Sequence, residues 1–263
     1  MMDLKLKDKK VLVLASSRGI GREIANKYAQ EGASVIITGR NEDVLKKTAD
    51  EISEQTGSEV IPFVTDVSKK EDINRLFAFV KEHFGVLDVL VSNAGGPPII
   101  DFETSDEADW YDAFELTLMS SVRAIKAAIP LMKENGQGRI LYVASTSIKE
   151  PISELLLSNI FRSGVQALCK SLASDYAKNQ ILINIVGLGK IDTDRLRSID
   201  KRNAALNQVE LADWQNSVQE SIPVGRYGTP GEFAEAAVFL GSYRNTYITG
   251  QTLLIDGGLV KAY

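Results

Sequence analysis

The stretch KVLVLASSRGIG, residues 10–21, decides the fold. Its first half is a short apolar run rich in β-branched residues, which predicts a buried strand, and Gly19 and Gly21 open the helix expected after it. Because glycine has no side chain, a phosphate can approach the backbone N–H groups and the positive end of that helix. The stretch therefore predicts a nucleotide site. The alternative is a tight strand-to-helix turn that binds nothing.

Six further apolar runs of the same kind follow, and amphipathic segments of helical period separate them. Several of these segments end at a glycine that can cap a helix. Continuous apolar strands that alternate with helices predict a parallel sheet covered on both faces, and hence a doubly wound α/β fold of the Rossmann type. The predicted strands are 10–16, 34–39, 60–66, 89–95, 138–145, 181–189 and 251–257.

Composition narrows the class of function. The chain has 263 residues, 44% hydrophobic and 25% charged, which suits a folded soluble domain. A net charge of −5 without a long basic run argues against nucleic-acid and membrane partners, so a small-molecule ligand is expected. No apolar run approaches the roughly 18 residues of a membrane span, and no signal peptide is visible, so we expect a cytoplasmic protein. One cysteine, Cys169, and one histidine, His83, predict neither an internal disulfide nor a metal site.

Residues 194–224 depart from the alternating pattern. They form a polar, helix-like insertion between the last two predicted strands, and they are too short to build a core of their own. We therefore predict a single domain over residues 1–263, with a mobile substrate lid at about 194–224.

Charged and polar residues follow the predicted strands where a ligand would lie. Arg18 sits in the glycine-rich turn, and Arg40 ends the second strand, where a site for NAD would usually place an acidic residue on the ribose. Two guanidinium groups favour a 2′-phosphate, so NADP(H) is predicted over NAD(H). Asp66 and Asn93 close the third and fourth strands at the same edge of the sheet. The alternatives are solvated surface arginines and, for Asp66, a helix cap.

Several motifs together resemble those of the short-chain dehydrogenase/reductase family, in particular its 3-oxoacyl-[acyl-carrier-protein] reductase-like branch. They are LASSRGIG, Asp66-Val67, SNAG, GRILYVAS, NIVGLGKIDT, PVGRYGTPGEFA and ITGQTLLIDGG, and they cover nearly the whole chain. The resemblance implies a seven-stranded sheet of order 3-2-1-4-5-6-7, a nicotinamide cofactor along its carboxyl edge, and a homo-tetramer or homo-dimer. It also implies a small carbonyl or alcohol substrate.

The resemblance assigns most cofactor-binding positions, with two departures. Leu14 and Ala15 stand where the family usually has Thr-Gly, and Leu188 replaces the proline that usually precedes Gly189. Thr193 matches the threonine that commonly holds the nicotinamide amide. The residues expected to bind the cofactor are Ser16, Ser17, Arg18, Gly19, Ile20, Gly21, Arg40, Asp66, Val67, Asn93, Ala94, Gly95, Arg162, Gly189, Ile191 and Thr193.

The catalytic positions differ from the family more than the cofactor positions do. Ser145 matches the serine at the end of the fifth strand, but Ser158 and Arg162 stand where the family has tyrosine and lysine. Thr117 stands at the family's asparagine position. A tyrosine phenol, with a pKa near 10 that an ammonium group lowers, is a suitable acid at neutral pH, whereas an unaided serine is not. Arginine keeps the positive charge but does not readily release a proton.

Positions 158 and 162 share one helical face, and three interpretations follow. In the first, a divergent reductase uses Ser145, Ser158 and a bound water in place of the phenol, with Arg162 holding the cofactor ribose or an anionic substrate. In the second, the protein binds NADP(H) as a sensor or assembly partner without fast turnover. In the third, Ser158 is a helix-terminal residue and Arg162 forms only a salt bridge.

Other groups near these positions receive structural interpretations. We expect Lys149 and Glu150 to be solvated loop charges; the spacing of Ser145 and Lys149 also fits a serine hydrolase with a lysine base, but Pro151 disfavours a helix there. Core or surface positions are expected for the remaining candidates, which are Tyr142, Tyr227, His83 and Cys169.

Overall fold

Seven parallel strands form one sheet in the order β3-β2-β1-β4-β5-β6-β7, which confirms the predicted topology. The computed structural model describes residues 3–262, except for the side chain of residue 154. All seven predicted strands are present, and several end one to three residues earlier than expected because the chain turns into a loop there; in the first strand the turn begins at Leu14 and Ala15, the latter at a positive φ. The strands are β1 (Lys10–Val13), β2 (Ser34–Gly39), β3 (Val60–Val64), β4 (Val89–Ser92), β5 (Gly138–Ser145), β6 (Ile181–Leu188) and β7 (Thr252–Ile255).

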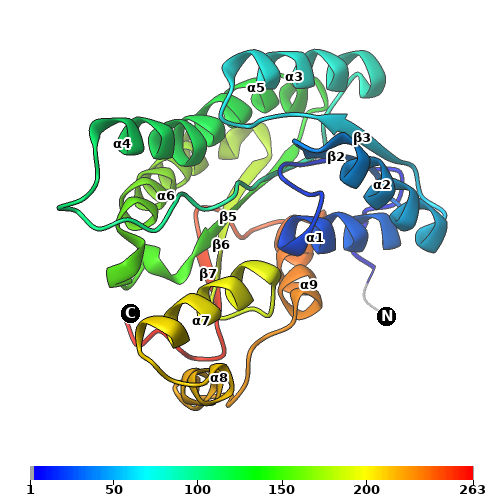
Figure 1. Cartoon of the computed structure of the whole chain (residues 1–263). Coiled ribbons are helices and arrows are strands. Elements are labelled where there is room, and N and C mark those ends of the chain that lie inside the picture. Colours follow the sequence, from blue (N-terminus) through cyan, green and yellow to red (C-terminus); the bar gives the residue numbers. More distant parts are fainter. Residues whose placement is uncertain (1–2, 263) are drawn as a thin grey trace.

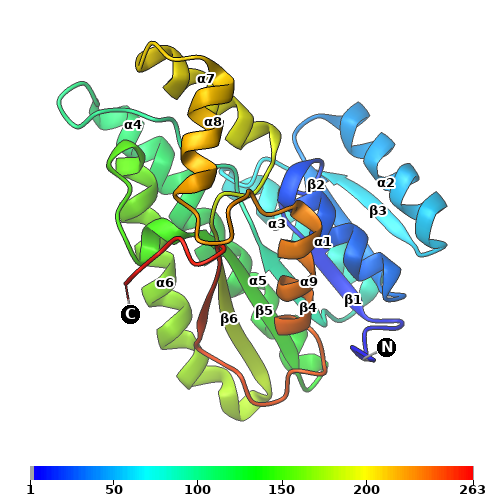
Figure 2. The same cartoon turned by 90° about the horizontal axis from the view of Figure 1, so that it is seen from below.

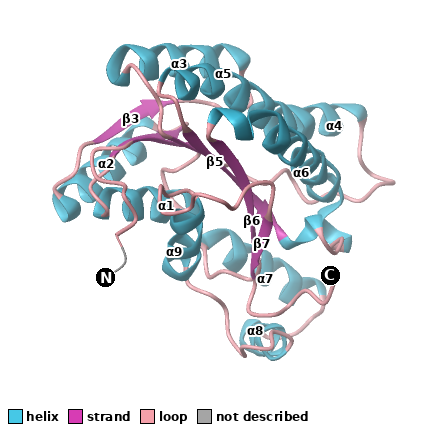
Figure 3. Cartoon of the chain, turned by 180° about the vertical axis from the view of Figure 1, so that it is seen from behind, coloured by secondary structure: helices cyan, strands magenta, loops and turns pink. Residues whose placement is uncertain are grey.

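Helices cover both faces of the sheet (Figures 1 and 3). One face carries α1 (Gly19–Gln30), α2 (Glu42–Thr56) and α9 (Pro230–Leu240), and the other carries α3 (Lys70–Phe84), α5 (Ser120–Glu134) and α6 (Leu156–Tyr176). Alternation along the strands explains this, since Val11 and Val13 pack in the first core while Leu12 and Leu14 pack in the second. Strands buried on both faces thus read as continuous apolar runs.

Short helical segments connect these layers, most of them at the carboxyl edge of the sheet. A helix, α4 (Glu107–Ala113), runs through a π-helical segment, η1 (Phe114–Met119), into α5. After β5 come two 3₁₀ turns, η2 (Thr146–Ile148) and η3 (Ser153–Leu155), and a third, η4 (Ala177–Asn179), ends α6.

The predicted lid consists of two helices, α7 (Asp194–Leu206) and α8 (Leu211–Glu220), which project beyond the carboxyl ends of the strands (Figure 2). Asp200, 1% exposed, joins them, because its carboxylate accepts hydrogen bonds from Trp214 Nε1 at 3.3 Å and from the Tyr227 hydroxyl at 3.0 Å. The helical insertion is confirmed, whereas its mobility stays a prediction.

The opposite edge of the sheet is held by a buried carboxylate. Asp88, 4% exposed, accepts hydrogen bonds from Lys9 Nζ at 3.0 Å, Asn135 Nδ2 at 2.9 Å and the Tyr243 hydroxyl at 2.8 Å, and also from the Lys10 backbone. Burial opposes its ionisation, but these hydrogen bonds together hold the pKa of Asp88 below its usual value. Hydrogen bonds to one buried carboxylate therefore hold several segments together at the amino edge of the sheet.

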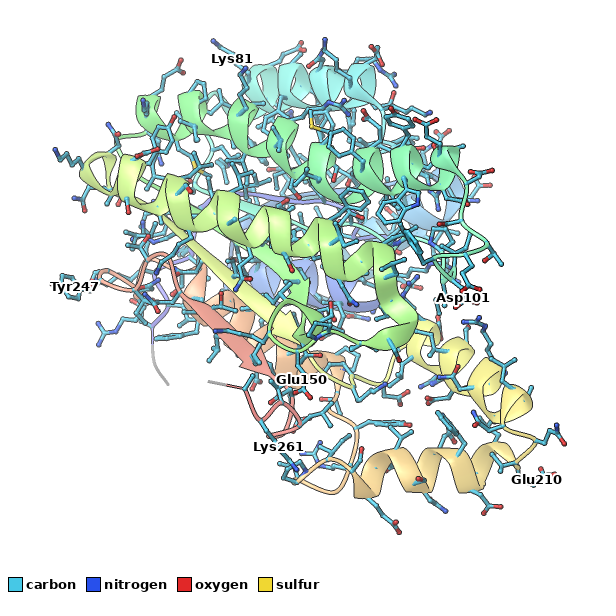
Figure 4. All side chains as sticks on the ribbon, turned by 90° about the vertical axis from the view of Figure 1, so that its left-hand side faces the viewer. Lys81, Asp101, Glu150, Glu210, Tyr247 and Lys261 are labelled. Carbon is cyan, nitrogen blue, oxygen red and sulfur yellow. The ribbon has the colours of Figure 1, made fainter. Side chains whose placement is uncertain are left out.

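The surface shows features that bear on partners. Within residues 3–262, no helix is both long and apolar enough to cross a membrane. Tyr247, 96% exposed, projects from the loop before the edge strand β7 (Figure 4). Assembly into a dimer or tetramer stays a prediction.

Candidate active site

The glycine-rich turn between β1 and α1 leaves room for a phosphate. A Cβ added to Gly19, at φ +60°, would have nothing within 4 Å, whereas one at Gly21 would lie 2.5 Å from the carbonyl oxygen of Ala15. The space beside Gly19 is thus open to a ligand, and the missing side chain of Gly21 lets α1 pack closely on the turn. The described residues provide no side-chain cap for the N-terminus of α1 and no acidic residue in its first turn. These positions fit the diphosphate of a dinucleotide.

Ala15 occupies this turn with φ +48°, in the left-handed region that disfavours residues with a Cβ. Ala15→Gly should raise the free energy of unfolding by about 1 kcal/mol, because the strain relieved exceeds the extra entropy of glycine in the unfolded chain. Thermal denaturation should show a rise in Tm of about 2 °C for a chain of this size.

The control for this prediction is Ala167→Gly, at an exposed position inside α6, which should lower stability by up to about 1 kcal/mol. An equal loss of stability in both variants would contradict the strain assigned to Ala15.

The two predicted phosphate-binding arginines are exposed beside this turn. Arg18 precedes α1 and Arg40 follows β2, and neither has a carboxylate within 4 Å among the described residues. Ser17 packs against β2, since a Cβ at Gly39 would lie 2.9 Å from its Oγ. Ser16 is buried and donates its hydroxyl to the Val13 carbonyl at 2.7 Å. The turn is thus fixed by serines, which leaves the arginines available to a ligand.

Polar residues at the ends of β3 and β4 also shape this edge. Asp66 accepts hydrogen bonds from the backbone and hydroxyl of Ser68, at 3.0 and 2.8 Å, in a turn that precedes α3. It does not cap the helix, whose N-cap residue is Lys69, so that alternative was wrong. Val67 is buried in the core beneath.

Asn93 connects β4 to the phosphate turn. Its Nδ2 donates to the carbonyls of Leu14 and Ala15, each at 3.2 Å, and thereby fixes the loop through which a nucleotide would be held. Ala94 is partly buried and Gly95 exposed, along the path from the turn to the end of β5.

The segment after β6 contributes further positions. A Cβ at Gly189 would lie 2.5 Å from the backbone of Asp256, so glycine is required there by close packing. Ile191 is 3% exposed and pairs with Gly228 in an isolated bridge. Thr193 accepts a hydrogen bond from the Leu196 backbone at 3.3 Å and so caps α7. Because the hydroxyl oxygen of Thr193 acts as an acceptor in this bond, its hydrogen is available for donation to a ligand.

Ser145 ends β5 and is the N-cap residue of η2. Its Oγ accepts a hydrogen bond from the Ser147 backbone at 3.2 Å, so the hydroxyl hydrogen is free to be donated to a substrate oxygen. Lys149 and Glu150 are exposed beyond η2, and Figure 4 shows Glu150 at the surface. The prediction that they are loop charges is confirmed, and Ser145 and Lys149 are not one turn apart on an α-helix.

Ser158 and Arg162 lie one turn apart on the buried face of α6, at 6% and 7% exposure. Arg162 donates from Nε to Ser158 Oγ at 3.1 Å and from Nη1 to the Val143 carbonyl of β5 at 3.0 Å. Among the described residues no carboxylate lies within 4 Å of Arg162, so the interpretation that it only forms a salt bridge is wrong. A buried cation without an anion points to a ligand or a developing negative charge.

Thr117 lies in the π-helical segment η1 and is 1% exposed. Its hydroxyl has no hydrogen-bond partner in the described part of the chain, while its carbonyl accepts from Ser121 Oγ at 3.4 Å. π-Helical turns often occur at functional sites. The buried hydroxyl of Thr117 is therefore available to hydrogen-bond a water molecule or a ligand.

The remaining candidates take the core or surface positions expected of them. Tyr142 is 1% exposed; burial raises its pKa, and the charge of Arg162 opposes that rise. Tyr227 binds Asp200, His83 lies at the surface near Glu59, and burial raises the pKa of Cys169 to about 12. The side chains that the structure describes contain no group of three metal-ligating residues.

One arginine was not found by sequence reasoning. Arg195, two positions after Thr193, extends from α7 to the loop after β4 and donates to the carbonyls of Gly96 and Pro97 at 3.5 and 3.3 Å. The only signal was an arginine at the start of the lid, in a segment where acidic and basic residues alternate.

A family model described as enoyl-(acyl carrier protein) reductase matches residues 14–260 of the chain. The chain belongs to the short-chain dehydrogenase/reductase family. It is accordingly a short-chain oxidoreductase of the alcohol/carbonyl class, as the sequence predicted.

Relatives and solved structures agree with this assignment. The short-chain dehydrogenase/reductase is 31% identical to glucose 1-dehydrogenase 2 of Bacillus subtilis, over 97% of this chain and 95% of that protein. It is 31% identical to a 3-oxoacyl-[acyl-carrier-protein] reductase of Chlamydia muridarum, over 98% and 100%. L-Sorbose reductase from Gluconobacter frateurii, solved with NADPH and L-sorbose, superposes with a TM-score of 0.95 at 30% identity, covering both chains completely.

Proposed function

We propose that this protein reduces a carbonyl compound, or oxidises the matching alcohol, with NADP(H), using Ser145, Ser158 and Arg162 in place of the usual catalytic set. The observation that carries the proposal is Arg162, a buried guanidinium on Ser158 with no carboxylate within 4 Å among the described residues. Three of the structurally similar proteins were solved with, or are named as dependent on, NADPH.

The cofactor's nicotinamide would supply the hydride, and the chain's own groups would stabilise the oxygen that becomes negative. Ser145 and Ser158 each already accept a hydrogen bond, from Ser147 N–H and Arg162 Nε–H. Each hydroxyl hydrogen is therefore available to donate to the substrate oxygen. The guanidinium of Arg162 makes Ser158 a better donor and adds a positive charge, while a water supplies the proton.

The cofactor preference rests on the arginines beside the phosphate turn. Arg40→Asp should raise the Kd for NADPH about tenfold or more and leave the Kd for NADH unchanged or lower, because a carboxylate repels a 2′-phosphate and binds a ribose hydroxyl. Titration of each nucleotide by fluorescence measures both constants.

Arg22→Gln serves as the control, since Arg22 lies on α1 but pairs with Glu51 at 3.1 Å. An unchanged ratio of the two constants in Arg40→Asp would remove Arg40 from the phosphate site.

A second candidate function is cofactor binding without fast turnover, as a sensor or assembly partner. The serine at position 158 favours it, because a hydroxyl without a phenol's acidity is a weak proton donor. Tight NADPH binding with no oxidation by any carbonyl compound would favour this function over the first.

A further inference from the structure

A second pair of arginines lies on the lid, facing the loop that follows β4. Arg195 and Arg202 are seven positions apart on α7, with Ser198 between them, so all three lie on one side of the helix. They line a cavity of about 220 Å³ together with Ile199 of the same helix and with Pro97, Pro98 and Ile99. The cavity thus has a cationic wall on the lid and an apolar wall on the body of the protein.

The acidic residues of α7, and Asp192 just before it, are bound elsewhere. Asp192 and Asp194 form ion pairs with Arg197 at 2.8 and 3.7 Å. Asp200 accepts hydrogen bonds from Trp214 and Tyr227. Among the described residues no carboxylate lies within 4 Å of Arg195 or Arg202. The two exposed arginines of the cavity thus have no carboxylate partner among the described residues, in contrast to Arg197 on the same helix.

The positive charge of the cavity is felt together with that of Arg162 on α6. Arg195 rests on the Gly96 and Pro97 carbonyls, and partial desolvation and the charge of Arg162 both lower its pKa. Arg162 itself is 7% exposed and has only neutral acceptors. Cations gathered in this way repel one another, and an anion bound between them would remove that cost.

We propose that Arg195 and Arg202 bind the carboxylate of the substrate, so that the physiological substrates are oxo acids or the matching hydroxy acids. The inference rests on the proposed reductase function and adds the substrate class to it. Guanidinium groups suit this role because their planar donors match a carboxylate. The apolar wall of Pro97, Pro98 and Ile99 would contact the carbon chain. The charge of Arg162 acts on Arg195, so the carbonyl end of the substrate would extend toward α6.

The anion that the two arginines bind could also be the diphosphate of the cofactor. An experiment therefore measures cofactor and substrate binding separately. NADPH is titrated first into the purified protein. Pyruvate, acetoacetate and levulinate, each paired with its methyl ester, are then titrated into the NADPH complex, with Trp fluorescence and NADPH oxidation as the readouts.

At least one acid should bind about tenfold or more tightly than its ester. Arg195→Gln and Arg202→Gln should each reduce that acid-to-ester ratio about tenfold and leave the Kd for NADPH within about twofold. Arg197→Gln is the matched control, on the same helix but paired with carboxylates, and should keep the ratio.

Three results would overturn the inference, and they differ in what they imply. NADPH binding with no preference for any acid removes the carboxylate site and leaves the reductase proposal intact. A tenfold loss of NADPH affinity in Arg195→Gln with an unchanged acid-to-ester ratio assigns the arginine to the cofactor phosphate. No NADPH binding by the natural protein overturns the proposed function and this inference together.

Discussion

Replacing Ser158 by tyrosine and Arg162 by lysine together should raise the rate of NADPH-dependent carbonyl reduction about a hundredfold. The reason is acidity, since a phenol beside an ammonium group delivers a proton near neutral pH, whereas a serine hydroxyl relies on water. Lysine also withdraws from the space beside Val143 that the guanidinium of Arg162 occupies, which makes room at the helix face for the larger side chain.

The measurement is the loss of NADPH absorbance with the best carbonyl substrate of the natural protein. Arg162→Lys alone is the control, because it restores the ammonium without the phenol and should gain little. Thermal denaturation and NADPH titration check that each variant is folded and binds the cofactor. A folded, cofactor-binding double variant no faster than the natural protein would show that the proton donor does not limit the reaction.

Asp88→Ala should lower the free energy of unfolding by about 3 kcal/mol. The carboxylate is 4% exposed and accepts hydrogen bonds from Lys9, Asn135 and Tyr243, and its removal leaves these donors without their acceptor. Arg139, 5% exposed, donates hydrogen bonds to carbonyl oxygens and lies over the Tyr243 ring, and it would also lose the negative charge nearby. Denaturant unfolding measures the loss.

The pH dependence of this effect has a definite sign. Because the folded protein holds the pKa of Asp88 below its unfolded value near 4, its stabilisation is complete above about pH 4 and is lost as the pH falls through the folded pKa. Asp88→Asn should therefore differ most from the natural protein at neutral pH, and the difference should narrow in acid.

Asp101→Asn, at an exposed loop position labelled in Figure 4, is the control and should change stability little at any pH. A constant difference between Asp88→Asn and the natural protein down to acid pH would contradict the lowered pKa.

The sheet could be predicted from the sequence because its strands are apolar on both faces and alternate with amphipathic helices. KVLVLAS and GRILYVAS are visible as strands for that reason alone. Their order was implied by the family resemblance, since strand order depends on contacts between distant segments that periodicity does not record.

The site was predictable only in part, because residue types reveal chemistry but not partners. Ser145, Ser158 and Arg162 could be named as candidates by position, yet the Nε–Oγ bond that joins the last two depends on how α6 packs on β5. A helix cap remained an alternative role for Asp66 until the structure placed the start of α3 after Lys69. Arg195 could not be distinguished from Arg197 in sequence, since only the fold shows which of them lies beside carboxylates.

Asp200 has a consequence for how the lid can behave. Asp200 belongs to α7. Its two carboxylate oxygens accept hydrogen bonds from Trp214 of α8 and from Tyr227, which lies in the segment that returns to the sheet. Any opening that keeps these bonds must swing both helices as one rigid body, with bending confined to the chain on either side. Arg195 and Arg202 would then leave the β4 loop in a single step, so capture and release of a ligand would be concerted rather than sequential.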